Sequence, residues 1–188
     1  MPGMTSAAED LPTVSFGAYL LNEQEAPRRH EFVGGRVYAM AGGSERHELA
    51  AMLVSDALRP GARAAGCRSF VANRMLRAAG SAYYPDFLIV CGPAEHRLYE
   101  ADASLIVEVL SASTQDHDRR EKAMAFASLT TLRHYLLVDP ERSSVEVAQL
   151  TDGQWEWQKY GPGSVVVTTY GVLDLDQLYA TLDAEATT

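Results

Sequence analysis

The chain has 188 residues, 47% of them hydrophobic, which is enough for one core and makes a single domain the expected organisation. No stretch approaches the roughly 20 apolar residues that a membrane-spanning helix needs, so we expect no membrane association. The formal net charge of −9 excludes the strongly basic composition of a dedicated DNA-binding protein.

The negative charge is concentrated at the C-terminal end of the chain. Residues 139–188 hold nine acidic residues against Arg142 and Lys159, a net charge of −7. Residues 1–138 carry the remaining −2 and most of the arginines. This nearly neutral part of the chain can still present a local basic groove to a nucleic acid.

Two features of the sequence bear on the cellular compartment. Residues 1–13 are predicted to form a flexible leader in front of a single domain over residues 14–188. The leader lacks the basic and apolar regions of a signal peptide, so we expect a cytoplasmic protein. Cys67 and Cys91 lack motif spacing and stand in apolar, strand-like surroundings. We interpret them as buried free thiols in a reducing cytoplasm, with a disulfide or a metal pair as the alternatives.

Two helices and a hairpin are predicted in the N-terminal third of the chain. Ser15 is a candidate N-cap for a helix over residues 16–24. The β-prone runs on either side of Gly34-Gly35 predict a hairpin. Ser44 then begins an amphipathic helix, which Pro60-Gly61 is expected to end.

The middle of the chain contains three apolar runs, at residues 85–90, 104–110 and 134–138. Runs of this length that are rich in β-branched residues are typical of strands covered on both faces. Residues 92–100 are predicted to be a polar turn, and residues 115–129 a helix. Because strands outnumber helices, we expect an α+β fold with a mixed central sheet flanked by helices.

The C-terminal quarter is predicted to add strands to this core. Residues 144–150 and 154–159 are expected to form a hairpin, and residues 165–168 a further strand. A short helix is expected near residues 175–182. We find no repeat, and no linker long enough to separate a second domain.

Two of the apolar runs each contain a carboxylate, Asp86 and Glu108. A lone ionised carboxylate in a buried strand costs several kcal/mol unless a positive charge or a hydrogen-bond donor meets it. The two acids lie 22 residues apart, which fits adjacent antiparallel strands with both side chains at one end of a sheet. Such hard oxygen ligands suit Mg²⁺ or Mn²⁺. The alternatives are a turn formed by Asp86 and a structural ion pair between Glu108 and an arginine.

Lys122 is the candidate cation of this site, at the start of a predicted helix. The chain has 14 arginines and only two lysines, so a retained lysine suggests that a compact charge is needed there. A lysine close to the two carboxylates can orient an attacking water or offset charge on a phosphate. The alternative is an exposed lysine paired with an acidic residue one turn earlier.

The sequence allows two roles for each of two further residues, Glu31 and His47. Glu31 can supply a third acid to the same pocket, or it can be an exposed hairpin glutamate. His47, in the first turn of a predicted helix, can contact a phosphate, or it can be a polar surface histidine.

Four stretches of the chain resemble the Uma-two-type family of restriction endonucleases, a branch of the PD-(D/E)XK nuclease superfamily, and the resemblance covers residues 16–182. The stretches are His30–Glu48, Tyr84–Val90, Leu105–Lys122 and His134–Val147. The resemblance implies a restriction-endonuclease-like core with Asp86 and Glu108 as metal ligands and Glu31 as the N-terminal acid of the site. Leu110 departs from the superfamily pattern, which places a lysine there. The resemblance implies that Lys122 supplies that lysine from the next helix.

These observations lead to one main hypothesis and two alternatives. The main hypothesis is a Mg²⁺-dependent endonuclease that cleaves DNA through Asp86, Glu108 and Lys122, and a homodimer would suit double-strand cleavage. The first alternative is a catalytically idle module that keeps the fold and binds nucleic acid or protein. The acidic charge and Leu110 favour this alternative. The second is a metal-dependent hydrolase that acts on a different phosphoester.

Overall fold

The computed structural model of the chain describes residues 13–40, 42–111, 117–151 and 154–186. The leader predicted over residues 1–13 therefore lies outside the described residues, except for Thr13. In these four ranges, no helix is both long and apolar enough to cross a membrane.

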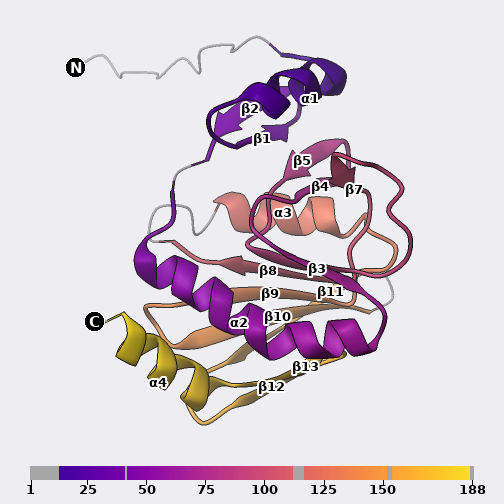
Figure 1. The fold of residues 1–188 in the computed structure, drawn as a ribbon. Helices are drawn as coiled ribbons and strands as arrows, with labels where there is room; N and C mark the ends of the chain where they lie inside the picture. Colours follow the sequence, from indigo (N-terminus) through magenta and orange to yellow (C-terminus); the bar gives the residue numbers. More distant parts are fainter. Residues whose placement is uncertain (1–12, 41, 112–116, 152–153, 187–188) are drawn as a thin grey trace, which may run out of the picture.

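Two sheets, a separate strand pair and helices packed around them make up the fold (Figure 1). The helices are α1 (Phe16–Glu25), α2 (Glu45–Ala64), α3 (His117–Phe126) and α4 (Leu175–Glu185). The six-stranded sheet has the order β11 (Gln154–Tyr160), β10 (Ser144–Thr151), β9 (His134–Asp139), β8 (Leu105–Val109), β6 (Phe87–Val90) and β3 (Arg68–Val71). The five-stranded sheet has the order β2 (Arg36–Ala39), β1 (His30–Val33), β5 (Ser81–Tyr83), β4 (Met75–Ala78) and β7 (Tyr99–Glu100). Strands β12 (Val165–Thr168) and β13 (Gly171–Asp174) pair with each other.

The six-stranded sheet is mixed, as predicted. Strand β8 pairs antiparallel with β6 and parallel with β9, and α3 lies in the crossover between the two parallel strands. Strands β10 and β11 extend the sheet in antiparallel fashion. The α+β prediction, with an N-terminal helix and hairpin and extra C-terminal strands, is confirmed.

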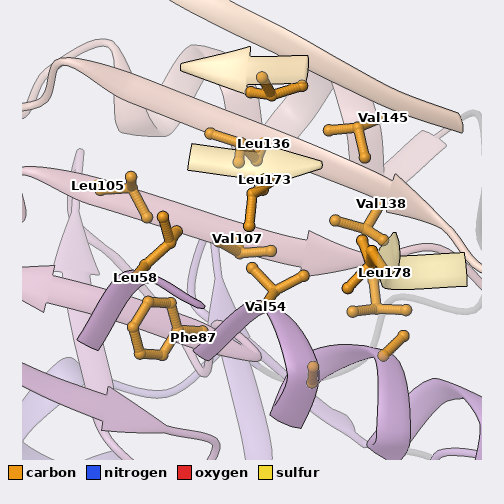
Figure 2. Packing of buried hydrophobic residues seen from close by; sticks show 14 of the residues in the cluster. Val54, Leu58, Phe87, Leu105, Val107, Leu136, Val138, Val145, Leu173 and Leu178 are labelled. Atoms are coloured by element: carbon orange, nitrogen blue, oxygen red, sulfur yellow. The ribbon is translucent and has the colours of Figure 1, made fainter. Parts of the chain in front are cut away.

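Strand β8 lies at the centre of the core and is covered on both faces. Leu105, Val107 and Val109 belong to the cluster that includes the apolar residues of α2 and α4 (Figure 2). Ile106 belongs to the opposite cluster, which includes Ala123 and other residues of α3. Because side chains alternate along a strand, even-numbered positions of β8 face α3. Glu108 therefore lies on the same face as the helix that carries Lys122.

The prediction that Pro60-Gly61 ends the second helix is wrong. Helix α2 continues through both residues to Ala64. A Cβ added at Gly61 would lie 1.8 Å from the carbonyl oxygen of Tyr170, so the glycine allows the β12–β13 turn to approach the helix closely. The helix ends instead just before Gly66, whose φ of +72° lies in the left-handed region that favours glycine. Gly61 thus serves packing rather than helix termination.

The prediction that Cys67 and Cys91 are buried free thiols is also wrong. The two residues form a disulfide with a Cα–Cα distance of 4.3 Å, and Cys91 is exposed. Strands β3 and β6 pair with Arg68 opposite Val90, and the next pair in this register is Cys67 opposite Cys91. The disulfide therefore joins directly opposed positions, a relationship that depends on strand register and is not visible in the sequence spacing.

Candidate active site

Strands β6 and β8 bring Asp86 and Glu108 together. The strands pair with Phe87 opposite Val107, and the same register places the next residues, Asp86 and Glu108, opposite each other. Both carboxylates are largely buried, with side chains 18% and 12% exposed. The prediction that these acids lie on adjacent antiparallel strands is confirmed.

The backbone of the neighbouring strand holds the Asp86 carboxylate in place. The N–H of Val109 donates a hydrogen bond of 2.7 Å to Asp86 Oδ2. This bond lies at the end of the β6–β8 ladder, one residue beyond the last backbone pair on β6. A carboxylate held by a backbone donor needs little reorganisation when it binds a cation. The donor belongs to β8, so the Asp86 side chain contributes to cross-strand structure rather than to a local turn alone.

His47, whose role was open from the sequence, lies beside Asp86. Its Nε2 lies 3.4 Å from Asp86 Oδ2, and its side chain is 17% exposed. The hydrogen bond with Asp86 raises the pKa of the His47 imidazole, against the opposing effect of burial. His47 is therefore a member of the carboxylate cluster and not an isolated surface histidine.

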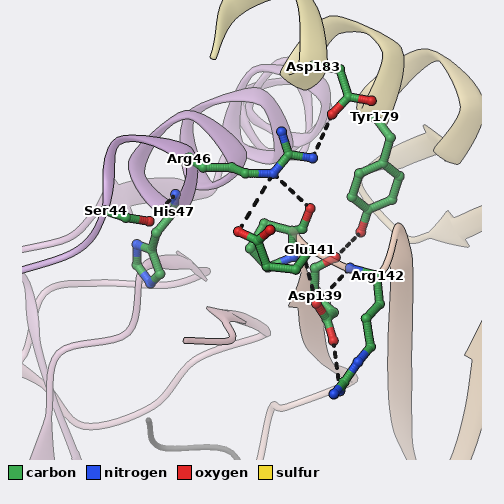
Figure 3. Close-up of polar contacts among 9 residues, drawn as sticks. Ser44, Arg46, His47, Asp139, Glu141, Arg142, Tyr179 and Asp183 are labelled. Carbon is green, nitrogen blue, oxygen red and sulfur yellow. Dashed lines mark hydrogen bonds and ion pairs between the residues drawn. The ribbon is translucent and has the colours of Figure 1, made fainter. Parts of the chain in front are cut away.

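Two residues just before His47 anchor the N-terminal end of α2. Ser44 caps the helix, and its hydroxyl accepts a hydrogen bond of 3.2 Å from the N–H of His47. Arg46 donates to the carbonyl of Pro140 at 3.0 Å and to Asp183 of α4 at 2.6 Å. Figure 3 shows Arg46 directed toward α4 and the β9–β10 turn, beside His47. These contacts fix the helix end that presents the imidazole to Asp86.

A signal for His47 was present in the sequence. It precedes Ala51, Val54 and Leu58 at helical spacing, and these three residues are buried. A histidine that continues the buried stripe of a helix faces the protein interior, where a polar ring needs a partner. Helical spacing from Ala51, Val54 and Leu58 therefore places residue 47 on the inner face of α2.

Lys122 lies inside the site, between two carboxylates. Its Nζ is 3.2 Å from Glu108 Oε1 and 2.9 Å from Glu31 Oε1, and its side chain is only 13% exposed. The ammonium also lies 5.9 Å from the centroid of the Tyr83 ring. The alternative of an exposed surface lysine is thus wrong.

Glu31 reaches the site from β1, in the five-stranded sheet. Its side chain is 16% exposed, so the alternative of an exposed hairpin glutamate is wrong as well. Glu31 Oε1 is buried, and the Lys122 ammonium lies 2.9 Å from it. Glu31 and Glu108 thus share the same cation.

Burial and charge act together on the titrating groups of the site. Burial raises the pKa of Glu108, and the negative charges of Asp86 and Glu31 add to the effect, while Lys122 opposes it. Burial by itself lowers the pKa of Lys122, but Glu108 and Glu31 outweigh it and hold the pKa of the ammonium above its ordinary range. The ionised form of Glu108 is therefore disfavoured in the site as it stands. A cation bound beside it would favour the ionised form.

The donors fit a hard divalent cation that keeps part of its water shell. Within the described part of the chain, no three His, Cys, Asp or Glu side chains are grouped closely enough to hold a metal ion by themselves. Mg²⁺, however, is commonly bound by one or two carboxylates together with water and substrate phosphate. Asp86 and Glu108, on opposed strand positions, match that smaller requirement.

Two proteins of one cyanobacterium are similar to this chain in sequence. The chain is 28% identical over 155 residues to the uncharacterized protein slr1290 of Synechocystis sp.. This alignment covers 80% of this chain and 82% of that protein. The chain is also 29% identical over 144 residues to the uncharacterized protein sll1609 of the same organism. This second alignment covers 73% of this chain and 81% of that protein.

The fold and the family follow from two further matches. The crystal structure of a protein from Anabaena variabilis, described as a putative nuclease belonging to DUF820, has a TM-score of 0.69 at 14% identity. The alignment covers 87% of this chain and 98% of that one, and at this identity it establishes the fold alone. Residues 16–177 match the sequence pattern of the Uma2 family, whose description is "Putative restriction endonuclease". The chain therefore belongs to the Uma2 family.

Proposed function

We propose that this protein is a metal-dependent endonuclease that hydrolyses phosphodiester bonds of DNA at the Asp86–Glu108–Lys122 site. The observation that carries the proposal is the position of Lys122, a buried ammonium 3.2 Å from a carboxylate of the central sheet. Burying a lysine and several acids together is costly, and such clusters occur preferentially at functional sites. The description of the Uma2 family supports a nuclease-like function.

Mg²⁺ or Mn²⁺ is the cofactor we propose, with Asp86 and Glu108 as its ligands and Glu31 as a third acid. When bound, such an ion polarises a phosphoryl oxygen and lowers the pKa of a coordinated water. The Val109 N–H keeps the Asp86 carboxylate oriented, so this proposed ligand would need little rearrangement to bind an ion.

Lys122 acts, in this proposal, on the negative charge that develops on the phosphate. Its ammonium is a compact charge held between Glu108 and Glu31, so its position is restricted before the substrate binds. A cation placed in advance in a partly dehydrated site stabilises a charged transition state more than a mobile surface lysine would. The same lysine also limits the repulsion between the two glutamates.

DNA and a homodimeric assembly are the finer parts of the proposal. DNA is favoured over other phosphoesters by the restriction-endonuclease description of the family. A homodimer would present two sites, as double-strand cleavage requires. Sedimentation that shows only a monomer at working concentration would reject the dimer and leave the site unaffected.

A second function, a nuclease fold that binds without cleaving, is favoured by one observation. Lys122 already pairs with Glu31 and Glu108, as the members of a purely structural ion cluster would. In that case the three residues stabilise the packing of α3 and β1 against the sheet, and no ion is needed.

Calorimetric titration of Mn²⁺ separates the two functions. We expect binding to the wild type and to a control variant, Glu156→Gln, which alters an exposed glutamate of β11. We expect no binding to Glu108→Gln, since this change removes the charge of one proposed ligand and keeps its shape. Undetectable binding to the wild type, or equal binding to Glu108→Gln, would contradict the proposed site and favour the structural cluster.

A further inference from the structure

Glu23 of α1 is a buried carboxylate that the proposed reaction does not use. It is 3% exposed, and its oxygens accept three hydrogen bonds. The donors are the N–H of His30 at 2.9 Å, the Nδ1 of the same histidine at 3.0 Å and the hydroxyl of Tyr84 at 3.1 Å. The tautomer of His30 that carries a proton on Nδ1 satisfies the contact with this carboxyl group. Such a fully satisfied buried acid holds its partners in a fixed arrangement.

Both partners of Glu23 are next to acids of the candidate active site. His30 directly precedes Glu31 on β1, and Tyr84 lies two residues before Asp86. Successive side chains of a strand point to opposite faces, so Glu23 holds β1 from the face opposite to Glu31. One carboxylate thus connects the two chain segments that deliver two of the three acids.

The segment that carries Glu31 has few other backbone attachments. Strand β1 pairs with its hairpin partner β2 along its whole length, but with β5 only through Phe32 opposite Ala82. The remaining attachment comes from side chains. Tyr19 donates to the His30 carbonyl at 2.6 Å, and Phe32 packs in a cluster with Tyr19 and Tyr84. On the other face, Val33 packs against the core cluster of α3 and the central sheet. The polar and aromatic network around Glu23 is therefore one of two side-chain attachments that position β1.

We propose that Glu23 is a positioning residue of the candidate active site, which fixes Glu31 and Asp86 relative to each other through His30 and Tyr84. Glu23 is expected to affect two properties. The first is the ion pair between Glu31 and Lys122, which depends only on how β1 is positioned. The second is cation binding, which rests on the function proposed above. The two properties are measured separately.

The first measurement needs neither metal nor DNA. Urea unfolding of Glu31→Gln, Lys122→Met and the double variant gives the coupling free energy between the two residues. The same cycle is then repeated in a Glu23→Gln background. We expect the coupling to fall in that background, because β1 loses the bonds that hold Glu31 near Lys122. An unchanged coupling would overturn the inference.

Glu100→Gln is the matched control. Glu100 is also a buried glutamate, 3% exposed, and it accepts hydrogen bonds from Arg68 and Arg74, which are not adjacent to any site residue. The control variant is expected to lose stability and to keep the coupling between Glu31 and Lys122. If Glu23→Gln does not fold, Tyr84→Phe replaces it, because this change removes only one of the three hydrogen bonds.

The second measurement is Mn²⁺ affinity by calorimetry. Loss of a residue that orients metal ligands weakens binding by about tenfold or more, and we expect this for Glu23→Gln but not for Glu100→Gln. Equal affinity in Glu23→Gln and the wild type would overturn the inference for the cation site. Absence of Mn²⁺ binding in the wild type would reject the proposed function, and the coupling measurement would still decide whether Glu23 positions Glu31.

Discussion

Lys122 Nζ lies 3.2 Å from Glu108 Oε1, although one residue belongs to α3 and the other to β8. The contact follows from topology, because α3 lies in the crossover between the parallel strands β8 and β9 and covers the face to which Glu108 points. The superfamily pattern places a lysine two residues after the glutamate, where this chain has Leu110. In this chain the lysine beside Glu108 is Lys122, which comes from α3 and not from the strand that carries the glutamate.

Replacing Lys122 with methionine is predicted to destabilise the protein by about 3 kcal/mol, because it leaves two buried carboxylates without their cation. The chain provides a matched control in its other lysine. Lys159 is 58% exposed and lies 3.8 Å from Glu146, so Lys159→Met should change the free energy of unfolding by less than about 1 kcal/mol. Urea denaturation of both variants checks the prediction, and equal losses would contradict the buried position of Lys122.

Gly61→Ala is predicted to destabilise the protein by about 2 kcal/mol, although alanine favours helix over glycine. The added Cβ would meet the carbonyl of Tyr170, so α2 and the β12–β13 turn must move apart. Gly17→Ala in α1 is the control, because no atom lies within 4 Å of the new Cβ, and it should stabilise by up to about 1 kcal/mol. Thermal unfolding of both variants is the test, and a stabilising Gly61→Ala would show that the close approach is not required.

Glu100 is predicted to make the stability fall in acid. Burial alone raises its pKa, but the hydrogen bonds and charges of Arg68 and Arg74 outweigh burial, and the pKa of Glu100 lies below its ordinary value of 4.5. As the pH falls, Glu100 is therefore protonated in the unfolded chain at a higher pH than in the folded protein. The stabilisation is present above about pH 4.5 and is lost as the pH falls through the pKa of the folded state.

Urea unfolding between pH 7 and pH 3 tests this dependence. Glu100→Gln should be less stable than the wild type at neutral pH and should lose less stability on acidification. Parallel pH profiles for the two proteins would contradict the assignment of this acid sensitivity to Glu100.

Reduction of the Cys67–Cys91 disulfide is predicted to lower the free energy of unfolding by about 3 kcal/mol, because the bridge closes a loop of moderate length in the unfolded chain. The expected measurement is a shift of the urea midpoint when a reductant is added. A Cys67→Ser, Cys91→Ser double variant should unfold at the midpoint of the reduced wild type and should not respond to the reductant. A wild type that is equally insensitive would mean that the bridge is not formed in solution.

Local pattern was sufficient to predict much of the fold. The apolar runs gave β6, β8 and β9, because strands covered on both faces need such runs. The spacing of Asp86 and Glu108 was informative for the same reason, since two strands and a turn use a predictable number of residues. The approach of Lys122 to Glu108 was suggested by the scarcity of lysine in the chain and by the family resemblance, but strand spacing could not show it.

Other features depend on contacts between distant segments and were not predictable. The turn expected over residues 92–100 contains the short strand β7, where Glu100 is buried because Arg68 and Arg74 bind it. Pro60-Gly61 looks like a helix end unless the neighbouring turn at Tyr170 is known. Both features depend on residues that are distant in the sequence, so local sequence pattern could not predict them.

The most direct test of the proposed site is plasmid nicking with Mg²⁺ or Mn²⁺ by the wild type, Glu108→Gln, Lys122→Met and Lys159→Met. We expect nicking by the wild type and Lys159→Met that stops when a chelator removes the ion. We expect a loss of about 100-fold or more in Glu108→Gln and Lys122→Met, because each removes a group held at the reacting phosphate. Folded wild type that binds the ion and leaves the plasmid intact, or nicking that persists in Glu108→Gln, would contradict the proposed site.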